Sequence, residues 1–236
     1  MAEVYWDLEG TLQQQGFDYT YDKRLYDRLS AQQARPVREH LQAGLDYQDR
    51  MARFLENHDE PRAAATFTPE VHAAAALLTY CTPGLRFFHQ GQFEGCRVRV
   101  SPHLLRAPEE PVDARIAQFY MQLRAALRHA ALRDGAWSLL DCTSAWPDNP
   151  SDGQIIAWRW QGPGDAWLCV AVNYAPQPGQ CFVRLPFAEL AGQRLQLQDL
   201  LGPAVYERPG DDLLGRGLYL DLPPWGHHLF EVTALA

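Results

Sequence analysis

Polar side chains that could do chemistry follow a short apolar segment, residues 53–55, where a proline then turns the backbone. Asn57 offers an amide, His58 an imidazole, Asp59 a carboxylate, and Arg62 a permanent cation. Such groups at the end of a strand are typical of the catalytic end of an α/β barrel. The plain alternative is a polar loop before a capped helix, because a His-Asp pair often occurs by chance.

A second candidate carboxylate, Glu3, lies at the start of the chain. It stands in the segment Ala2-Glu3-Val4-Tyr5-Trp6, which has the composition of a short strand. Considered alone, Glu3 is more simply a solvated carboxylate beside a chain terminus. Asp18 is equally compatible with a helix cap or a salt bridge.

Alternating strand and helix patterns would position these groups. Strands are predicted over residues 1–6, 17–19, 53–56 and 85–88, and helices over 8–15, 22–29, 36–50, 68–80 and 116–127. Asp22 and Thr68 stand at N-cap positions, Thr68 directly before a proline. Four strand–helix units make half of an eight-stranded barrel. We therefore predict an α/β domain over residues 1–134, a partial (β/α)8 TIM barrel.

After residue 134 the hydrophobic period changes from that of a helix to that of a strand. Alternating segments cover residues 155–160, 167–173, 181–185, 218–222 and 228–232, separated by Gly, Pro and Asp. This pattern predicts an all-β domain over residues 135–236, a C-terminal antiparallel β-sandwich. His227 and His228 are adjacent, so on a strand they point to opposite faces, and we interpret them as structural.

Composition excludes several classes of function. Of 236 residues, 47% are apolar and 21% charged, which predicts a packed core. The net charge of −8, without a basic run, argues against nucleic acid and anionic membranes as partners. No apolar stretch reaches membrane-spanning length, and no signal peptide is visible at Met1, so we expect a cytoplasmic protein unless its true N-terminus is missing.

The five cysteines are odd in number and lack C-x-x-C spacing. They are typical of free thiols in a reducing compartment, and they predict neither a disulfide framework nor a zinc site. We expect no cofactor and no bound metal.

The segment that ends in Asn57-His58-Asp59 resembles the fourth conserved region of the α-amylase family, glycoside hydrolase family 13, and the Glu3 segment looks like the third. The resemblance implies strands five to eight of that family's barrel, followed by its C-terminal β-domain. It implies Glu3 as general acid/base, Asp59 as the carboxylate that stabilises the transition state, and His58 as a sugar contact. Asn57 and Arg62 are expected to join the substrate-binding residues, with Arg62 pairing a carboxylate in the loop or fixing the turn.

Residues 83–92 resemble the family's eighth-strand segment, although their register assigns no role to Gln90, Gln92 or Glu94. His89 and His103 in the following loop either line a sugar subsite or are simply exposed.

The family's nucleophile is an Asp two residues after an Arg at the end of an earlier strand, and no Arg-x-Asp motif occurs in this chain. We therefore expect a fragment of a glycosidase or transglycosylase that acts on α-glucosidic bonds with retention, inactive by itself. Its ligand would be an α-glucan or a small α-glucoside. Its protein partner would be the missing N-terminal half of the barrel, or a second copy of this chain that pairs with the open barrel edges.

Two other functions stay open. The first is a non-catalytic carbohydrate-binding or scaffold protein derived from that family, which would bind saccharides weakly as a monodisperse protein. The second is a metal-dependent phosphohydrolase that uses His58 and Asp59. That class needs further His and Asp ligands on helices, and metal content would identify it.

Overall fold

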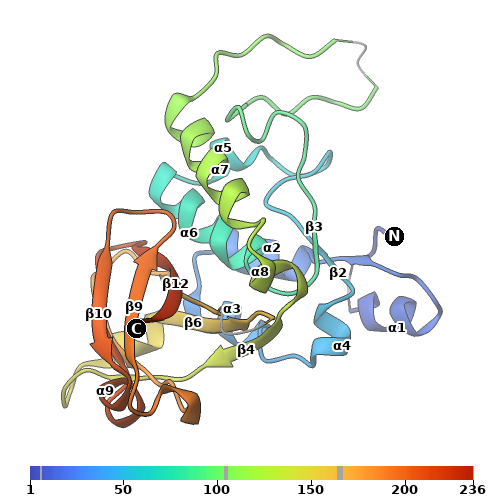
Figure 1. Ribbon diagram of the computed structural model, residues 1–236. Helices are drawn as coiled ribbons and strands as arrows, with labels where there is room; N and C mark the ends of the chain where they lie inside the picture. Colours follow the sequence, from blue (N-terminus) through green and yellow to red (C-terminus); the bar gives the residue numbers. More distant parts are fainter. Residues whose placement is uncertain (6, 104–105, 164–166, 236) are drawn as a thin grey trace. The chain divides into compact units, whose positions relative to one another are not determined.

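The computed structural model describes residues 1–5, 7–103, 106–163 and 167–235. The chain forms two compact units, Met1–Met121 and Gln122–Ala236 (Figure 1). Within the described ranges, every helix is too short or too polar to span a lipid bilayer. All five cysteines are free thiols.

The first unit alternates helices with short parallel strands. Its elements are α1 (Glu9–Gln14), β1 (Thr20–Tyr21), α2 (Lys23–Ser30), α3 (Ala34–His40), α4 (Leu45–Gln48), β2 (Met51–Arg53), α5 (Ala63–Thr66), α6 (Pro69–Tyr80), β3 (Leu85–Arg86) and α7 (Ala114–Ala126), the last of which crosses into the second unit. The strands pair in parallel in the order β1-β2-β3. The predicted strand over residues 1–6 is reduced to one parallel bridge between Ala2 and Thr20, and Trp6 lies outside the described residues.

Local sequence explains where these helices begin and end. Asp22 caps α2 by accepting a hydrogen bond from the backbone N–H of Leu25 at 3.1 Å, as predicted. The single helix predicted over residues 36–50 is wrong, because Gly44 adopts an extended conformation between α3 and α4. The Gln48 amide then donates to the carbonyl oxygens of Leu41 and Ala43 at that break.

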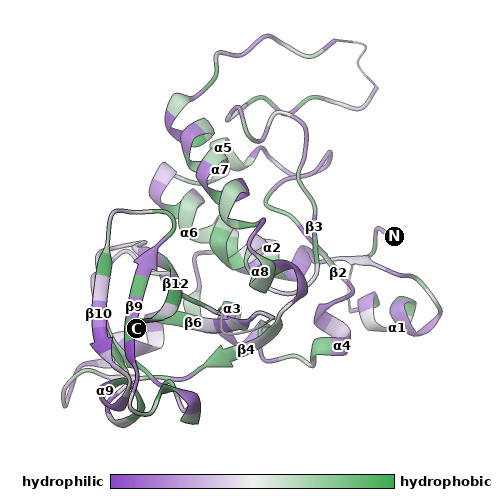
Figure 2. Cartoon of the chain, viewed as in Figure 1, coloured by the Kyte–Doolittle hydropathy of each residue, from purple (hydrophilic) through white to green (hydrophobic). Residues whose placement is uncertain are grey.

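Helix α6 follows Thr68 and begins with Pro69, as its sequence predicts. It is hydrophobic along most of its length (Figure 2) and is almost entirely buried after its first turn. A helix that is apolar on all sides must pack on all sides, which places α6 at the centre of the first unit.

Buried charges connect β2 to the helices. The Asp22 carboxylate forms ion pairs with His40 at 2.9 Å and with Arg53 at 3.2 Å, and all three side chains are buried. Nearby, the ring of Tyr21 lies 5.2 Å from that of Phe54 and 5.7 Å from that of Phe87. These contacts fix the strand from whose end the polar site residues project.

The second unit is mainly antiparallel. Its elements are α8 (Ala130–Asp134), β4 (Ala136–Leu140), β5 (Cys142–Ser144), the 3₁₀ helix η1 (Pro150–Gln154), β6 (Ile155–Gln161), β7 (Trp167–Asn173), β8 (Gly179–Val183), the 3₁₀ helix η2 (Ala188–Leu190), β9 (Arg194–Asp199), β10 (Val205–Pro209), α9 (Gly210–Gly215), β11 (Leu218–Leu222) and β12 (His227–Leu235). One sheet has the order β10-β9-β12-β7-β6-β4 and the other β11-β8-β5. Side chains from both sheets form one core.

The two units divide earlier than the expected boundary between residues 134 and 135. Regular structure does change there, because α8 ends at Asp134 and β4 begins at Ala136. The compact units nevertheless divide at Met121, since α8 contacts β6 and β7 of the second unit. In that unit, Nδ1 of His228 lies 2.7 Å from the Asp199 carboxylate, which agrees with a structural histidine.

Candidate active site

The site lies at the carboxyl end of the parallel sheet. Glu3 follows the Ala2 bridge directly, and His58 and Asp59 come after β2. Ala2, β1 and β2 run in the same direction, so the chain leaves all three at the same edge. Polar groups at this edge are held by the sheet and still face open space.

Glu3, His58 and Asp59 converge. Nε2 of His58 lies 3.9 Å from Oε1 of Glu3 and 3.5 Å from Oδ2 of Asp59, and the potential ligand atoms of the three residues all lie within 4.8 Å of one another. Their side chains are 40%, 41% and 49% exposed, so a solute can reach them. Two carboxylates and an imidazole at this spacing can handle protons and contact sugar hydroxyls, and they could also hold a divalent cation.

Tyr5 and Arg99 flank these three residues. The Tyr5 hydroxyl donates a hydrogen bond to Oε1 of Glu3 at 3.0 Å. Burial, followed by the charge of Glu3, raises the pKa of Tyr5 far above its ordinary value, so Tyr5 remains a donor. On the other side, Nη2 of Arg99 lies 3.8 Å from Oδ1 of Asp59.

Asn57 shapes the turn that presents His58 and Asp59. Its Oδ1 accepts hydrogen bonds from the backbone N–H groups of Asp59 at 2.9 Å and Glu60 at 2.8 Å. Asn57 is completely buried, which favours a role in holding this turn.

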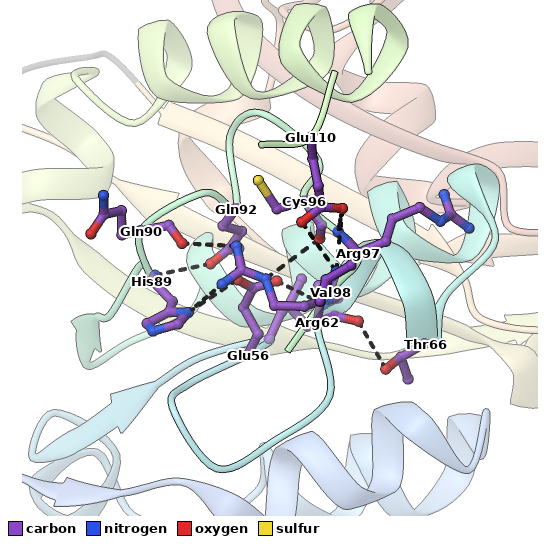
Figure 3. A network of polar contacts seen from close by, with 12 residues as sticks. Glu56, Arg62, Thr66, His89, Gln90, Gln92, Cys96, Arg97, Val98 and Glu110 are labelled. Carbon is purple, nitrogen blue, oxygen red and sulfur yellow. Dashed lines mark hydrogen bonds and ion pairs between the residues drawn. The ribbon is translucent and has the colours of Figure 1, made fainter. Parts of the chain in front are cut away.

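Arg62 belongs to a buried polar network behind the turn (Figure 3). Its Nη2 lies 3.1 Å from Oε1 of Glu56 and donates to the carbonyl oxygen of Gln90 at 2.8 Å, while its Nε donates to that of Cys96 at 3.4 Å. Arg62 therefore pairs with a carboxylate, which was one of its two expected roles. Its side chain is almost fully buried, which favours that role over direct sugar binding.

Glu56 was missed by the sequence analysis. It is completely buried, and its Oε2 accepts a hydrogen bond from the backbone N–H of Ala63 at 2.7 Å. Burial raises the pKa of Glu56 to about 7, although Ala63 and Arg62 act in the opposite direction. A glutamate directly after the apolar pair Phe54-Leu55, at the last position of the predicted strand, is the signal that could have found it.

A cavity of about 790 Å³ lies beside the candidate site. Its lining includes His58, Arg62, Phe88, His89 and Phe93, together with part of the long segment between β3 and α7. The two loop histidines therefore differ in their surroundings. His89 lines the cavity, whereas His103 is exposed and lies outside the described lining.

Hydrogen bonds close the base of that long segment. The Glu110 carboxylate accepts from the backbone N–H groups of Arg97 at 2.7 Å and Val98 at 3.2 Å (Figure 3). The backbone N–H of Asp113 donates to the carbonyl oxygen of Glu94 at 2.9 Å. The cavity wall near His89 is thus fixed at both ends.

Solved structures supply a match across nearly the whole chain. An α-amylase from Geobacillus thermoleovorans, complexed with acarbose, superposes with a TM-score of 0.69 at 17% identity, over 98% of this chain and 52% of that one. A maltogenic α-amylase from Thermotoga neapolitana gives 0.68 at 16% identity, over 99% and 54%. The chain shares the fold of α-amylases.

A debranching enzyme from Nostoc punctiforme, soaked with acarbose, has the same fold, with a TM-score of 0.62 at 18% identity over 97% of this chain and 49% of that one. The chain thus spans about half the length of the solved α-amylase-fold structures it matches. No family model and no curated protein sequence matches. The α-amylase fold that the resemblance implied is therefore confirmed.

Proposed function

We propose that this chain is part of an α-amylase-family glycoside hydrolase or transglycosylase that acts on α-glucosidic bonds with retention. The observation that carries the proposal is the convergence of Glu3, His58 and Asp59 at the carboxyl end of the parallel sheet. The solved structures with the same fold add support, because two of them hold acarbose.

In the proposed mechanism, Glu3 protonates the leaving glycosidic oxygen and then activates water. Asp59 and His58 hold the sugar ring as it flattens toward an oxocarbenium-like state. Tyr5 donates to Glu3 and orients its carboxyl group. Asn57 keeps the backbone of the turn in place, so that both His58 and Asp59 face the substrate.

Retention also requires a nucleophilic carboxylate opposite the acid/base, and the sequence has no Arg-x-Asp motif to supply it. We therefore propose that residues 1–236 bind α-glucans without cleaving them. Isothermal titration with maltotetraose, with cellotetraose as the β-linked control, tests this binding. Maltotetraose should bind, the β-linked isomer should not, and His58→Ala should weaken binding. Equal binding of the two sugars would contradict the proposal.

A non-catalytic carbohydrate-binding protein is the second candidate, favoured by the same missing motif. The two candidates differ in self-association, because an open parallel sheet edge invites pairing. A monodisperse monomer that binds maltotetraose, measured by light scattering, would favour the stand-alone binding protein. Association that depends on concentration would favour a partial barrel.

A further inference from the structure

Among the described residues, the imidazole of His89 is contacted at its Nδ1 edge. Its Nδ1 lies 2.9 Å from Nη1 of Arg62 and 3.3 Å from Oε1 of Glu56 (Figure 3). Its backbone is fixed as well: the His89 N–H donates to Oε1 of Gln92 at 3.2 Å, and the Gln92 N–H donates to the His89 carbonyl oxygen at 3.1 Å. The Gln92 amide in turn donates to the hydroxyl of Tyr80 at 2.7 Å.

These contacts select one tautomer of His89. A guanidinium group only donates hydrogen bonds and does not lose its proton in proteins, so Nδ1 must accept from Arg62. Glu56 lies farther from Nδ1 and already engages Arg62 and the backbone of Ala63. The ring proton is therefore left on Nε2, on the opposite edge of the ring.

Burial and the neighbouring Arg62 favour the neutral form of the His89 ring. Burial, then Arg62, then His58 lower the pKa of His89 below its ordinary value. The side chain is still 29% exposed, and it lines the 790 Å³ cavity together with His58. A neutral, rigidly held N–H donor thus borders a space large enough for a sugar.

We propose that Nε2–H of His89 donates a hydrogen bond to a hydroxyl oxygen of a saccharide bound in this cavity, as a specificity-determining contact beside His58. The assignment rests on the proposed function and gives a specific contact to His89, for which the sequence left both a sugar subsite and plain exposure open. A fixed N–H donor discriminates strongly between saccharides, because a ligand without the matching oxygen leaves the N–H group without a hydrogen-bond acceptor.

The first experiment measures the tautomer without any ligand. Long-range ¹H–¹⁵N correlation of histidine-labelled protein at neutral pH, with His89→Gln to assign the signal, should show Nε2 protonated and Nδ1 unprotonated. A proton on Nδ1 would overturn the proposal. His103, exposed in the same loop, serves as the reference for a histidine without such partners.

The second experiment measures maltotetraose binding. His89→Ala should raise Kd about tenfold, the effect of one lost hydrogen bond. His103→Ala should leave Kd unchanged. His89→Gln carries an amide donor near the position of Nε2 and should restore most of the affinity, whereas His89→Asn places its amide near Nδ1 and should not. The Gln and Asn pair keeps the test valid if the alanine variant is unfolded.

The outcomes separate the two proposals. If His58→Ala weakens binding and His89→Ala does not, the His89 assignment is wrong and the proposed function stands. If Gln and Asn behave alike at position 89, the assignment of the donor to Nε2 is wrong. If the unmodified protein does not bind maltotetraose, the proposed function fails and the His89 assignment falls with it.

Discussion

Nε2 of His58 lies 3.9 Å from Oε1 of Glu3, although one residue stands at the start of the chain and the other follows β2. Only the parallel pairing of Ala2, β1 and β2 brings them to one edge of the sheet. The site therefore depends on the sheet. A change that disturbs the parallel pairing will move Glu3 and His58 apart.

Catalysis by the isolated chain is the first prediction. Residues 1–236 should release no product from maltooligosaccharides, because a retaining mechanism needs a nucleophilic carboxylate that the sequence does not supply. Chromatography of maltotetraose digests measures this. Cleavage that disappears in Glu3→Gln would show that the chain contains its own nucleophile.

Replacing Asp22 tests the buried ion pairs. Asp22→Asn leaves Arg53 and His40 buried without their carboxylate, and we expect it to lower the free energy of unfolding by about 3 kcal/mol. The matched control is Asp27→Asn, which removes the carboxylate that pairs with Lys23 on the exposed face of α2. Asp27 is 57% exposed, so its loss should cost less than about 1 kcal/mol. Urea denaturation of both variants measures the difference.

The same ion pairs predict a response to acid. Burial raises the pKa of Asp22, but His40 and Arg53 outweigh burial and lower it. A carboxyl group with a lowered folded pKa contributes stability above its unfolded pKa, and that stability is lost as pH falls through the folded pKa. The stability difference between the wild type and Asp22→Asn should therefore shrink in acid. A difference that does not change with pH would contradict the charged assignment.

Glu56 should have the opposite pH dependence. Its folded pKa of about 7 exceeds its ordinary value of 4.5, so the folded state binds the proton more tightly and loses stability as pH rises between these values. The loss amounts to about 3 kcal/mol. Glu56→Gln cannot titrate, so its free energy of unfolding should fall less than that of the wild type over this window. Parallel slopes for both proteins would rule out a raised pKa.

Glycine at position 91 is required by space as well as by conformation. Gly91 has φ +86°, and a Cβ there would lie 2.5 Å from Nη2 of Arg62. Gly16 has φ +103° and no atom within 4 Å of such a Cβ. Both alanine variants should lose about 1–2 kcal/mol to backbone strain. Gly91→Ala should lose more, and it should also weaken maltotetraose binding by moving Arg62 away from His89.

Metal content tests the alternative that the protein is a metal-dependent phosphohydrolase. The convergence of Glu3, His58 and Asp59 could hold a cation, yet we expect no stoichiometric metal by mass spectrometry and no effect of EDTA on maltotetraose binding. One equivalent of a divalent metal that is lost in His58→Ala would favour the phosphohydrolase instead.

Elements with strong local signals were predictable from the sequence. The strands over Trp167–Asn173 and Leu218–Leu222 lie where their alternation placed them, and Asp22 caps its helix. Strand β9 was missed although its residues, Arg194–Asp199, also alternate and lie between Gly192 and the turn signal Gly202-Pro203. Local pattern therefore predicted many elements but not their full number.

The candidate site was predictable only in its exposed part. Glu3, His58 and Asp59 stand at strand ends, where side-chain type suggests chemistry. The roles of Asn57 and Glu56 depend on complete burial, which in turn depends on packing against segments far away in the chain. Local sequence does not show which distant segments pack together. The burial of a charged or polar residue could therefore not be predicted from it.

Arg62 and Glu110 hold the β3–α7 segment at Cys96 and at Arg97 and Val98, and Gln92 holds the backbone of His89. The hydrogen bonds that hold His89 therefore come from residues before Val98, whereas the described residues between Val98 and Glu110 contribute cavity lining and the contact of Arg99 with Asp59. The residues between Val98 and Glu110 can thus be changed separately from the residues that hold His89. We expect substitutions there to change saccharide binding while the hydrogen bonds of His89 stay in place.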